Sequence, residues 1–319
     1  MVAVRVHEAL RPVLERSCSY CSEDAVYTRE YEGASFCGSC FRRSIEERVR
    51  RTVTTYEMLA YNDHIALALS GGKDSLTLLN ILVKLERRFP RSKLTAICVD
   101  EGIEGYRDEA LLLATKECRR LGIEQVTVSY KELFGTTTDE IVRTRSEKTP
   151  CAYCGVLRRK AINKAAVMVN ATKIATAHNL DDEVQTVLLN ILHGDPMRLV
   201  RSAPVLHDVR GRFLTRIKPL CDIPEKEVVL YAYLTGLEFQ SIACPHSTEA
   251  LRNDIRAFLN QMDQKHPGTK FTLQRSAERL RELLTESAPA VELNDCEKCG
   301  DPTPHRFCEA CIMLETVTA

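Results

Sequence analysis

Cysteine pairs with the spacing C-x-x-C are the feature of this 319-residue sequence that most limits what it can fold into. The chain contains 14 cysteines, and random placement of that number would give about 0.6 such pairs. Five pairs occur, namely Cys18/Cys21, Cys37/Cys40, Cys151/Cys154, Cys296/Cys299 and Cys308/Cys311. A C-x-x-C pair can direct both sulfur atoms at one ion, and two pairs complete the tetrahedral shell of four thiolates found in structural zinc sites.

Four of these pairs form two quartets, one toward each end of the chain. The first quartet is Cys18, Cys21, Cys37 and Cys40, and the second is Cys296, Cys299, Cys308 and Cys311. Each segment is too short to bury a core of its own, so a bound metal would supply its folding energy. Reduced free thiols are the alternative, but scattered core cysteines do not form two regular quartets. We therefore predict two zinc knuckles.

The start of the sequence, MVAVRVHEAL, has no long apolar run and no small-residue cleavage site, and nowhere do about 18 apolar residues stand together. We therefore expect neither export nor a membrane span, and predict a cytoplasmic location. In that reducing compartment, paired thiols act as metal ligands or redox centres rather than as structural disulfides.

The chain has no net charge, with 44 Lys and Arg against 44 Asp and Glu, so a nucleic-acid surface would require local segregation of charge. Two stretches meet that requirement. The segment Phe41–Arg51 carries five arginines against two glutamates, and the segment Lys148–Lys164 carries five cations and no acid. Both suit contacts with RNA phosphates, although a solvated helical face is the alternative for the first.

Short apolar runs alternate with helical patterns between the two cysteine-rich ends. The strand candidates are 65–69, 94–99, 126–129, 173–177 and 237–242, and the helix candidates are 74–85, 108–121, 155–170, 180–192 and 225–235. This alternation predicts an α/β fold with a doubly wound parallel sheet, whose ligand site lies beyond the carboxyl ends of the strands. Residues 243–290 have a mostly helical pattern. The predicted organisation is an N-terminal extension with a zinc knuckle and basic helix over 1–51, a catalytic α/β domain over 52–290 and a C-terminal zinc knuckle over 291–319.

A candidate phosphate loop, SGGKDS, follows the first apolar run and opens a helix. It consists of Ser70, Gly71, Gly72, Lys73, Asp74 and Ser75. The glycines let the backbone approach a phosphate closely, and the two hydroxyl groups and the lysine add further contacts. The loop has neither the Walker A spacing nor the G-x-G-x-x-G pattern of dinucleotide sites. Its aspartate suits phosphates only beside a divalent cation such as Mg²⁺. A plain glycine-rich turn is the alternative.

A second candidate, HNLDDE, covers His178 to Glu183 and follows the strand predicted at 173–177. Its acidic residues, including Asp182, fall in the first turn of a predicted helix and on the same rim of the sheet as SGGKDS. The helix dipole favours acids in a first turn whatever their function, so a purely structural role is the alternative.

The central pair Cys151/Cys154 has no second pair nearby, but Cys244, in SIACPH, could add a third thiolate from the rim of the sheet. Three thiolates leave a metal or a cluster with an open coordination position, which is typical of a chemical site rather than a closed structural one. A redox dithiol and inert buried cysteines are the alternatives. The remaining cysteines, Cys98, Cys118 and Cys221, are interpreted as core or incidental residues.

Taken together, these segments resemble the cytoplasmic tRNA 2-thiolation enzymes, a group within the PP-loop ATP pyrophosphatase superfamily. The group includes archaeal and eukaryotic wobble-uridine enzymes and the related T-loop thiolases. The matching segments are SGGKDS at Ser70, VDEGIEGYRDE at Val99, VSYKELFG at Val128, CAYCGVLRR at Cys151, AHNLDDE at Ala177 and ACPHS at Ala243, together with the two terminal quartets. The resemblance therefore spans almost the whole chain, from about Cys18 to Cys311.

The resemblance implies an ATP-dependent sulfurtransferase that adenylates the C2 oxygen of a tRNA uridine and then replaces it with sulfur. Cys151, Cys154 and Cys244 align with the family's three ligands of a 4Fe-4S cluster, and Asp182 aligns with its catalytic aspartate. ATP, Mg²⁺, the cluster and two Zn²⁺ are the implied cofactors, with ATP and Mg²⁺ at SGGKDS, His178 and Asp182. The implied partners are tRNA, a second copy of the chain, and a sulfur donor that is either a ubiquitin-like thiocarboxylate protein or sulfide.

Two positions depart from the family pattern. T-loop enzymes have a functional lysine four residues after the second cluster cysteine, where this chain has Arg158. Lysine and arginine differ in acid-base capacity, so a role in proton transfer is not carried over to Arg158. Together with VDEGIEGYRDE and VSYKELFG, this arginine makes the chain resemble the wobble-uridine branch more closely. The family usually has glycine before His-Asn, where this chain has Ala177.

Four alternative classes of protein remain. The first is a T-loop thiolase, and the second is another PP-loop enzyme, such as an amide-forming ATP pyrophosphatase or a tRNA lysidine synthetase. The third is a persulfide-based sulfurtransferase without a cluster, and the fourth is a non-catalytic zinc-dependent RNA-binding module. The first retains the same cysteines, whereas amide-forming enzymes and lysidine synthetases do not need all three central cysteines. SGGKDS followed by HNLDDE argues against the RNA-binding module.

Overall fold

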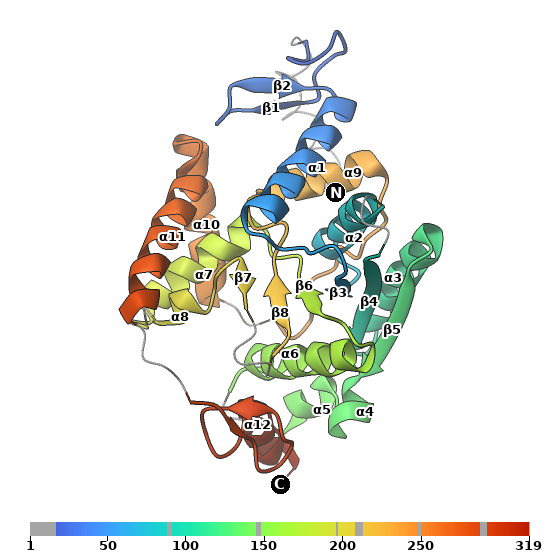
Figure 1. Cartoon of the computed structure of the whole chain (residues 1–319), viewed down its shortest axis with the longest axis vertical. Helices are drawn as coiled ribbons and strands as arrows, with labels where there is room; N and C mark the ends of the chain where they lie inside the picture. Colours follow the sequence, from blue (N-terminus) through green and yellow to red (C-terminus); the bar gives the residue numbers. More distant parts are fainter. Residues whose placement is uncertain are drawn as a thin grey trace.

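The computed structural model describes residues 17–87, 91–144, 148–195, 197–207, 213–247, 250–287 and 292–318. Its centre is a six-stranded sheet with the strand order β5-β4-β3-β6-β8-β7 (Figure 1). The strands are β3 (His64–Ala68), β4 (Lys93–Asp100), β5 (Glu124–Ser129), β6 (Lys173–Ala175), β7 (Val205–Leu206) and β8 (Thr215–Ile217). All neighbours pair in parallel except β7, which is antiparallel to β8. The predicted α/β fold with a parallel sheet is confirmed.

The chain changes direction across the sheet between β3 and β6. It adds β4 and then β5 on one side of β3, and returns to place β6 on the other side. In open α/β sheets such a switch point leaves a crevice at the carboxyl ends of the two strands, where ligands bind. SGGKDS follows β3 and AHNLDDE follows β6, so both candidate segments lie at this crevice.

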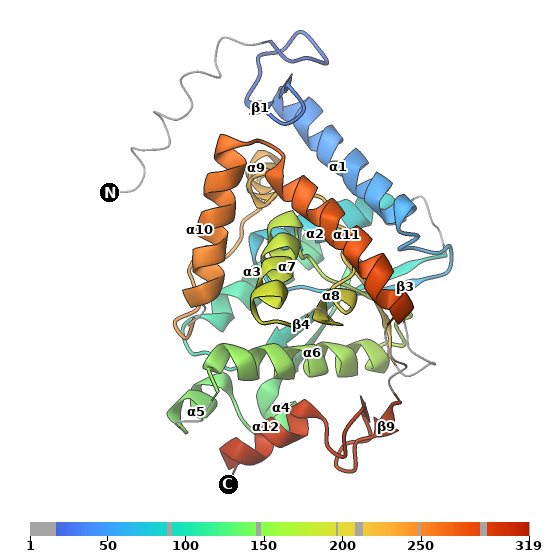
Figure 2. The ribbon, with the colours of Figure 1, turned by 90° about the vertical axis from the view of Figure 1, so that its left-hand side faces the viewer.

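Alternate residues of the strands point into two separate cores. In β3, Ile65 and Leu67 belong to one cluster of buried side chains and Ala66 to the other. The first face is covered by α1 (Gly38–Thr55), α2 (Lys73–Glu86), α3 (Arg107–Leu121) and α9 (Glu225–Thr235). The second face is covered by α6 (Pro150–Met168), with α4 (Tyr130–Phe134), α5 (Thr138–Arg143) and α12 (Glu309–Thr318) around it (Figure 2). The expected doubly wound arrangement is therefore present.

A group of helices flanks the sheet on the side of β7. It consists of α7 (Leu180–Leu192), α8 (Met197–Val200), α10 (Ala250–Lys265) and α11 (Thr269–Ser287). Leu180 and Val184 of α7 pack against Ile255 and Leu259 of α10, and Figure 2 shows α10 and α11 beside α7. The helical pattern predicted for 243–290 is thus confirmed from residue 250 to residue 287, while 248–249 and 288–290 lie outside the described residues.

The strand predicted at 237–242 is wrong. Those residues form an irregular segment after α9, and β8 occupies the place beside β6 in the sheet. The three residues of β8, including the charged Arg216, give too short an apolar signal to be recognised. The helix predicted at 155–170 begins earlier, at Pro150, because Thr149 caps it and proline suits a first helical position. Cys151 and Cys154 therefore lie inside α6.

Each end of the chain forms a small module that completes one core. The N-terminal module pairs β1 (Tyr27–Arg29) with β2 (Ala34–Phe36) and continues into α1, and Phe36 and Phe41 enter the first core. The C-terminal module pairs β9 (Asn294–Asp295) with β10 (Pro302–Thr303), and Met313 of α12 enters the second. Figure 1 shows the two modules at opposite ends of the molecule.

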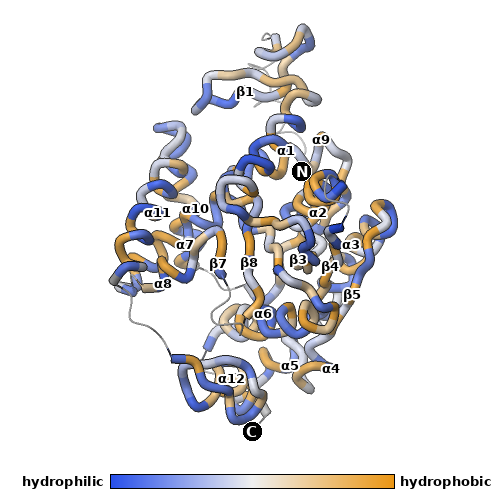
Figure 3. Tube along the Cα trace, viewed as in Figure 1, coloured by the Kyte–Doolittle hydropathy of each residue, from blue (hydrophilic) through white to orange (hydrophobic). Residues whose placement is uncertain are grey.

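Figure 3 contrasts the mostly hydrophobic α2, buried in the centre, with the hydrophilic α1 on the surface. Helix α1 buries only one stripe of side chains, including Phe41, Ile45 and Val49. Its remaining faces carry the charged residues of the predicted basic helix. Among the described residues, no helix is both long and apolar enough to cross a bilayer.

Candidate active site

SGGKDS forms a tight loop between β3 and α2. Gly71 has a φ of +83°, and a Cβ atom there would lie 2.2 Å from the carbonyl oxygen of Ala110, so only glycine fits. The hydroxyl of Ser75 lies 3.1 Å from both the backbone nitrogen and the hydroxyl oxygen of Ser70. Gly72 precedes α2 without a side-chain cap. The first N–H groups of this helix are therefore open to an anion such as a phosphate.

Two residues outside the predicted motif hold this loop from behind. Arg107, in the first turn of α3, donates from Nη1 to the carbonyl oxygen of Ser70 over 2.6 Å. The backbone nitrogen of Gln240 donates to the carbonyl oxygen of Gly71 over 3.1 Å. The sequence offered no local signal for either contact, because each joins residues more than 35 positions apart.

The loops after β3 and β6 meet across the switch point. Lys73 Nζ lies 2.8 Å from Asp74 Oδ2 and 2.9 Å from Oε1 of Glu225, in the first turn of α9. Asn179 donates from Nδ2 to Asp74 Oδ1 over 3.1 Å. The expectation that SGGKDS and HNLDDE share one rim is confirmed, and Glu225 is a third acidic residue that the sequence did not reveal.

Asp182 stands in the first turn of α7, where it forms a capping box with Asn179. Burial raises the pKa of Asp182 to about 6, against the lowering effect of the Asn179 backbone N–H, and the negative charges of Asp74 and Glu225 raise it further. Carboxylates whose charges repel one another at close range suit a divalent cation. The oxygens of the three acids do not all lie within 4.8 Å of one another, so a cation at this rim would need phosphate oxygens as further ligands beside one or two of these carboxylates.

His178 lies just before α7, with Nδ1 2.9 Å from the hydroxyl of Thr176. Its ring reaches solvent, but the surrounding protein is dense. Desolvation by this surrounding protein is the main cause that lowers the pKa of His178 to about 4, and the positive charges of Lys218 and Arg252 lower it further. The imidazole is therefore neutral at pH 7 and can form hydrogen bonds without carrying charge.

The structure brings together the three central cysteines. Cys151 and Cys154 are in the first turns of α6, and Cys244 lies on the irregular segment after α9. The Cys151 thiol is 3.7 Å from the carbonyl oxygen of His246, two residues after Cys244. Burial raises the pKa of Cys244, and the charges of Cys154 and Cys151 contribute to the rise. The three thiols are therefore close enough to influence one another electrostatically at the rim of the sheet.

Arg158 connects this cysteine group to the loop after β4. Its Nη2 lies 3.0 Å from the Cys154 sulfur, and its Nε lies 2.7 Å from Oε1 of the buried Glu101. Unlike the quartets, the three sulfur atoms do not all lie within 4.8 Å of one another. Thiolates that share one ion lie close together, so in this arrangement the three sulfur atoms do not jointly surround a single ion, whereas a cluster with several irons is not bound by that limit.

The two terminal quartets have the geometry of four-thiolate metal sites. In each, all four sulfur atoms lie within 4.8 Å of one another. The measured separations include 3.5 Å between Cys21 and Cys37 and 3.6 Å between Cys299 and Cys308. A tetrahedral zinc site with Zn–S bonds of about 2.3 Å has sulfur atoms about 3.8 Å apart. The sulfur positions therefore fit Zn²⁺.

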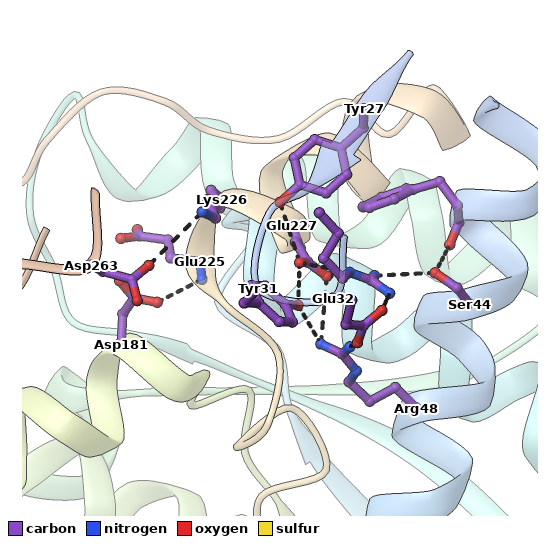
Figure 4. A network of polar contacts seen from close by, with 12 residues as sticks. Tyr27, Tyr31, Glu32, Ser44, Arg48, Asp181, Glu225, Lys226, Glu227 and Asp263 are labelled. Carbon is purple, nitrogen blue, oxygen red and sulfur yellow. Dashed lines mark hydrogen bonds and ion pairs between the residues drawn. The ribbon is translucent and has the colours of Figure 1, made fainter. Parts of the chain in front are cut away.

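A buried ion pair attaches the N-terminal module to α9, and Figure 4 shows Glu227, its acidic member, with Tyr31 and Arg48 nearby. Arg29 Nη2 lies 2.7 Å from Oε2 of Glu227 in α9, and the two side chains are 2% and 0% exposed. Tyr31 donates to the same carboxylate, and Arg48 Nη1 donates to the Tyr31 hydroxyl over 2.6 Å. The basic helix α1 is thereby held in a defined position.

The C-terminal module is attached to α6 through Lys160. The ammonium group lies 3.0 Å from the Cys299 sulfur and 3.8 Å from the Cys308 sulfur, and pairs with Asp301, while the side chain is only 7% exposed. Of the five cations of Lys148–Lys164, whose local charge was expected to attract RNA phosphate, Lys160 is buried and is not available for such a contact. Its charge compensates the thiolates of the quartet instead.

Comparisons with known proteins agree with this arrangement. The family model described as the PP-loop domain matches residues 42–262, and the model described as the N-terminal LIM domain of the 2-thiouridine synthetase TtuA matches residues 17–42. The tRNA 2-thiolation protein NcsA of Haloferax volcanii is 38% identical, over 95% of this chain and 99% of that protein. The cytoplasmic tRNA 2-thiolation protein 1 of Danio rerio is 36% identical, over 93% and 87% respectively.

Among solved structures, the chain is similar to the U34-tRNA thiolase NcsA from Methanococcus maripaludis, determined with its [4Fe-4S] cluster. The TM-score is 0.82 and the sequence identity 35%, and the match covers 94% of this chain and 95% of that one. The similarity extends beyond the PP-loop domain to both terminal modules, because little of either chain is left unmatched.

Proposed function

The chain belongs to the PP-loop family of tRNA 2-thiolation proteins, and from this membership we propose that it is an ATP-dependent tRNA uridine 2-sulfurtransferase. The observation that carries the proposal is that the nucleotide loop and the three central cysteines lie on one rim of the sheet, joined by direct side-chain contacts. An enzyme that activates an oxygen with ATP and replaces it with sulfur needs both sites within reach of one substrate atom.

In the first step, the C2 oxygen of the uridine attacks the α-phosphate of ATP, and pyrophosphate leaves. The open N–H groups of SGGKDS and α2 would bind the leaving pyrophosphate, with Lys73 adding positive charge. Asp74 and Asp182 would hold Mg²⁺, which offsets the charge of the phosphates. His178, neutral at pH 7, would form a hydrogen bond to the nucleotide. Adenylation turns a poor leaving group into AMP, a good one.

In the second step, sulfur adds at C2 and AMP leaves, which gives 2-thiouridine. Cys151, Cys154 and Cys244 would hold a 4Fe-4S cluster, which supplies an iron without a protein ligand for the incoming sulfur. Arg158 would stabilise the Cys154 thiolate through the contact from its guanidinium. The sulfur would come from sulfide or from the thiocarboxylate of a ubiquitin-like protein.

We propose the wobble uridine of the anticodon as the target, because the similar enzyme from Methanococcus maripaludis is a U34-tRNA thiolase. A base in the anticodon loop is easier to flip into a pocket than one in a paired stem. Arg43 and Arg51 on α1, and Lys164 on α6, are on accessible helix faces and would contact tRNA phosphates.

Zinc in the two quartets would hold the terminal modules in their folded form. Two statements stay predictions. One is the division of the chain into three domains, over 1–51, 52–290 and 291–319, and the other is the homodimer. Limited proteolysis of zinc-loaded and zinc-free protein tests the first, and sedimentation equilibrium tests the second.

The decisive experiment purifies the chain without oxygen, measures iron and sulfide, and incubates it with ATP, sulfide and a tRNA transcript. Mass spectrometry of nuclease fragments then locates the thiolated nucleoside. We expect 2-thiouridine at the wobble position, dependent on iron and ATP. Modification in the T-loop would favour the alternative target, and thiolation by iron-free protein would favour a persulfide route. Replacing sulfide with a thiocarboxylated ubiquitin-like protein tests the donor.

A further inference from the structure

A continuous chain of charged contacts joins the cysteine group to the phosphate loop. Arg158 Nη2 lies 3.0 Å from the Cys154 sulfur, and Arg158 Nε lies 2.7 Å from Glu101 Oε1. The other oxygen of the carboxylate, Oε2, lies 2.7 Å from Arg107 Nε. Arg107 Nη1 in turn donates to the carbonyl oxygen of Ser70 over 2.6 Å. One carboxylate therefore stands between the two sites, with one oxygen directed toward each.

Glu101 occupies the centre of this chain in a rigid setting. Its side chain is 5% exposed, and that of Arg107 is 6% exposed, so water screens their interaction little. The Glu101 carbonyl oxygen accepts a hydrogen bond of 2.8 Å from the backbone nitrogen of Thr138. The next residue, Gly102, has a φ of +66°, and a Cβ atom there would lie 2.6 Å from Thr137. The loop after β4 thus has little freedom to move.

Arg158 is held less tightly than its partners. Its side chain is 49% exposed, and the contacts with Glu101 and Cys154 set the direction of its guanidinium. A hydrogen-bond donor on a cluster cysteine tunes the cluster, and the groups behind the donor decide where it points. A phosphate bound at SGGKDS changes the electrostatic field at Arg107 and Glu101, and this fixed network transmits the change to the Arg158 contact on Cys154 without a movement of the loop after β4.

On the basis of the proposed function, we propose that Glu101 is a positioning residue shared by the two steps of the reaction. It holds Arg107 against the nucleotide loop and Arg158 against the cluster cysteine. Nucleotide binding is thereby coupled to the state of the sulfur site. Because such coupling is reciprocal, the presence of the cluster must change nucleotide affinity by the same factor by which the nucleotide changes cluster affinity.

The test measures the dissociation constant of α,β-methylene-ATP with Mg²⁺ by calorimetry, on cluster-loaded and cluster-free protein. In the wild-type protein we expect the two constants to differ by about fivefold or more, the lower range of measured couplings. In Glu101→Gln, which keeps the shape but removes the charge, the ratio should fall below about twofold. The electron paramagnetic resonance spectrum of the reduced cluster should change on addition of the analogue in the wild type only.

Arg158→Met is the second variant, because its half-exposed side chain can be replaced without opening the buried Glu101–Arg107 pair. The Arg158→Met protein should bind the analogue, but with nearly the same dissociation constant whether or not the cluster is present. Glu117→Gln is the matched control, since Glu117 pairs with Arg120 within α3, apart from this network, and it should behave as the wild type. Undiminished coupling in both Glu101→Gln and Arg158→Met would overturn the proposal, as would equal constants in wild-type protein. A wild-type chain that binds neither iron nor the analogue would instead refute the proposed function on which it rests.

Discussion

Asn179 donates from Nδ2 to Oδ1 of Asp74 over 3.1 Å and so ties the loop after β6 to the loop after β3. The same side chain accepts from the backbone nitrogen of Asp182 and caps α7. One buried amide thus serves both the stability of a helix and the arrangement of Asp74 and Asp182 at the switch point of the sheet.

These two roles can be separated by substitution. Asn179→Ser should keep the cap, because serine caps helices about as well as asparagine, but its hydroxyl is too short to reach Asp74. We expect a change of stability below about 0.5 kcal/mol and a roughly tenfold weaker binding of α,β-methylene-ATP. Asn179→Ala should lose about 1 kcal/mol as well. Urea unfolding and calorimetry measure the two effects, and unchanged affinity in the serine variant would show that the contact with Asp74 is dispensable.

Asp74→Ala and Asp182→Ala should each abolish ATP-dependent thiolation and leave tRNA binding nearly unchanged. Both carboxylates lie where a cation would accompany the phosphates, whereas the surface cations proposed for tRNA lie on α1 and α6. Pyrophosphate release and a filter-binding assay with tRNA separate the two functions. Activity retained in both variants would place the ATP site elsewhere.

The pKa of about 6 for Asp182 has a consequence for stability in metal-free protein. An unfolded aspartate has a pKa of about 3.9, so the folded chain holds the proton more tightly. Ionisation of this group therefore opposes folding, and its stabilising proton is lost as pH rises from about 4 to about 6. Asp182→Asn cannot ionise.

In EDTA, we therefore expect the Tm of Asp182→Asn minus the Tm of the wild type to increase between about pH 4 and about pH 6, and to stay constant above that range. Differential scanning calorimetry at several pH values tests this expectation. A Tm difference that stays constant with pH would mean that the carboxyl ionises in the folded chain at its ordinary pKa.

Lys160→Met should weaken zinc binding at the C-terminal quartet. The ammonium group 3.0 Å from the Cys299 sulfur offsets part of the negative charge that four thiolates leave on a zinc site. Replacing a residue that contacts a metal ligand typically lowers metal affinity by about 10- to 100-fold. We expect one of the two zinc ions to be released to a chelating dye faster, by about that factor, and the other to be unaffected.

Lys164→Met provides the comparison, because Lys164 lies one turn farther along α6 and contacts the ring of Phe134 rather than the quartet. It should release both zinc ions at the wild-type rate. Equal acceleration in the two variants would indicate a general loosening of α6.

The sequence was most informative where function depends on local spacing. The quartets, SGGKDS and HNLDDE were recognisable because each is a short pattern whose geometry follows from the backbone around it. The alternation of strands and helices also placed both motifs on one rim. Short strands carry a weaker signal, so β8 was missed and a segment at 237–242 was assigned in its place.

The contacts made by Glu101, Arg107, Glu225 and Lys160 could not be predicted in this way. Most of these contacts join residues far apart in the chain, and a charged residue taken alone is most often expected at the surface. Lys160 shows the difficulty, since its neighbours Arg158 and Arg159 are solvent-accessible whereas it is buried. Only the packing of the C-terminal module on α6, with Cys299, Asp301 and Cys308 around the ammonium group, determines which of these cations faces inward.

The two terminal modules each complete one core of the same sheet, with Phe36 and Phe41 on one face and Met313 on the other. If the quartets bind zinc as proposed, a newly made chain without the metal would leave apolar side chains exposed on both faces of the sheet at once. Chaperones and proteases recognise such surfaces, so the supply of zinc in the cell would govern how much of this protein survives synthesis.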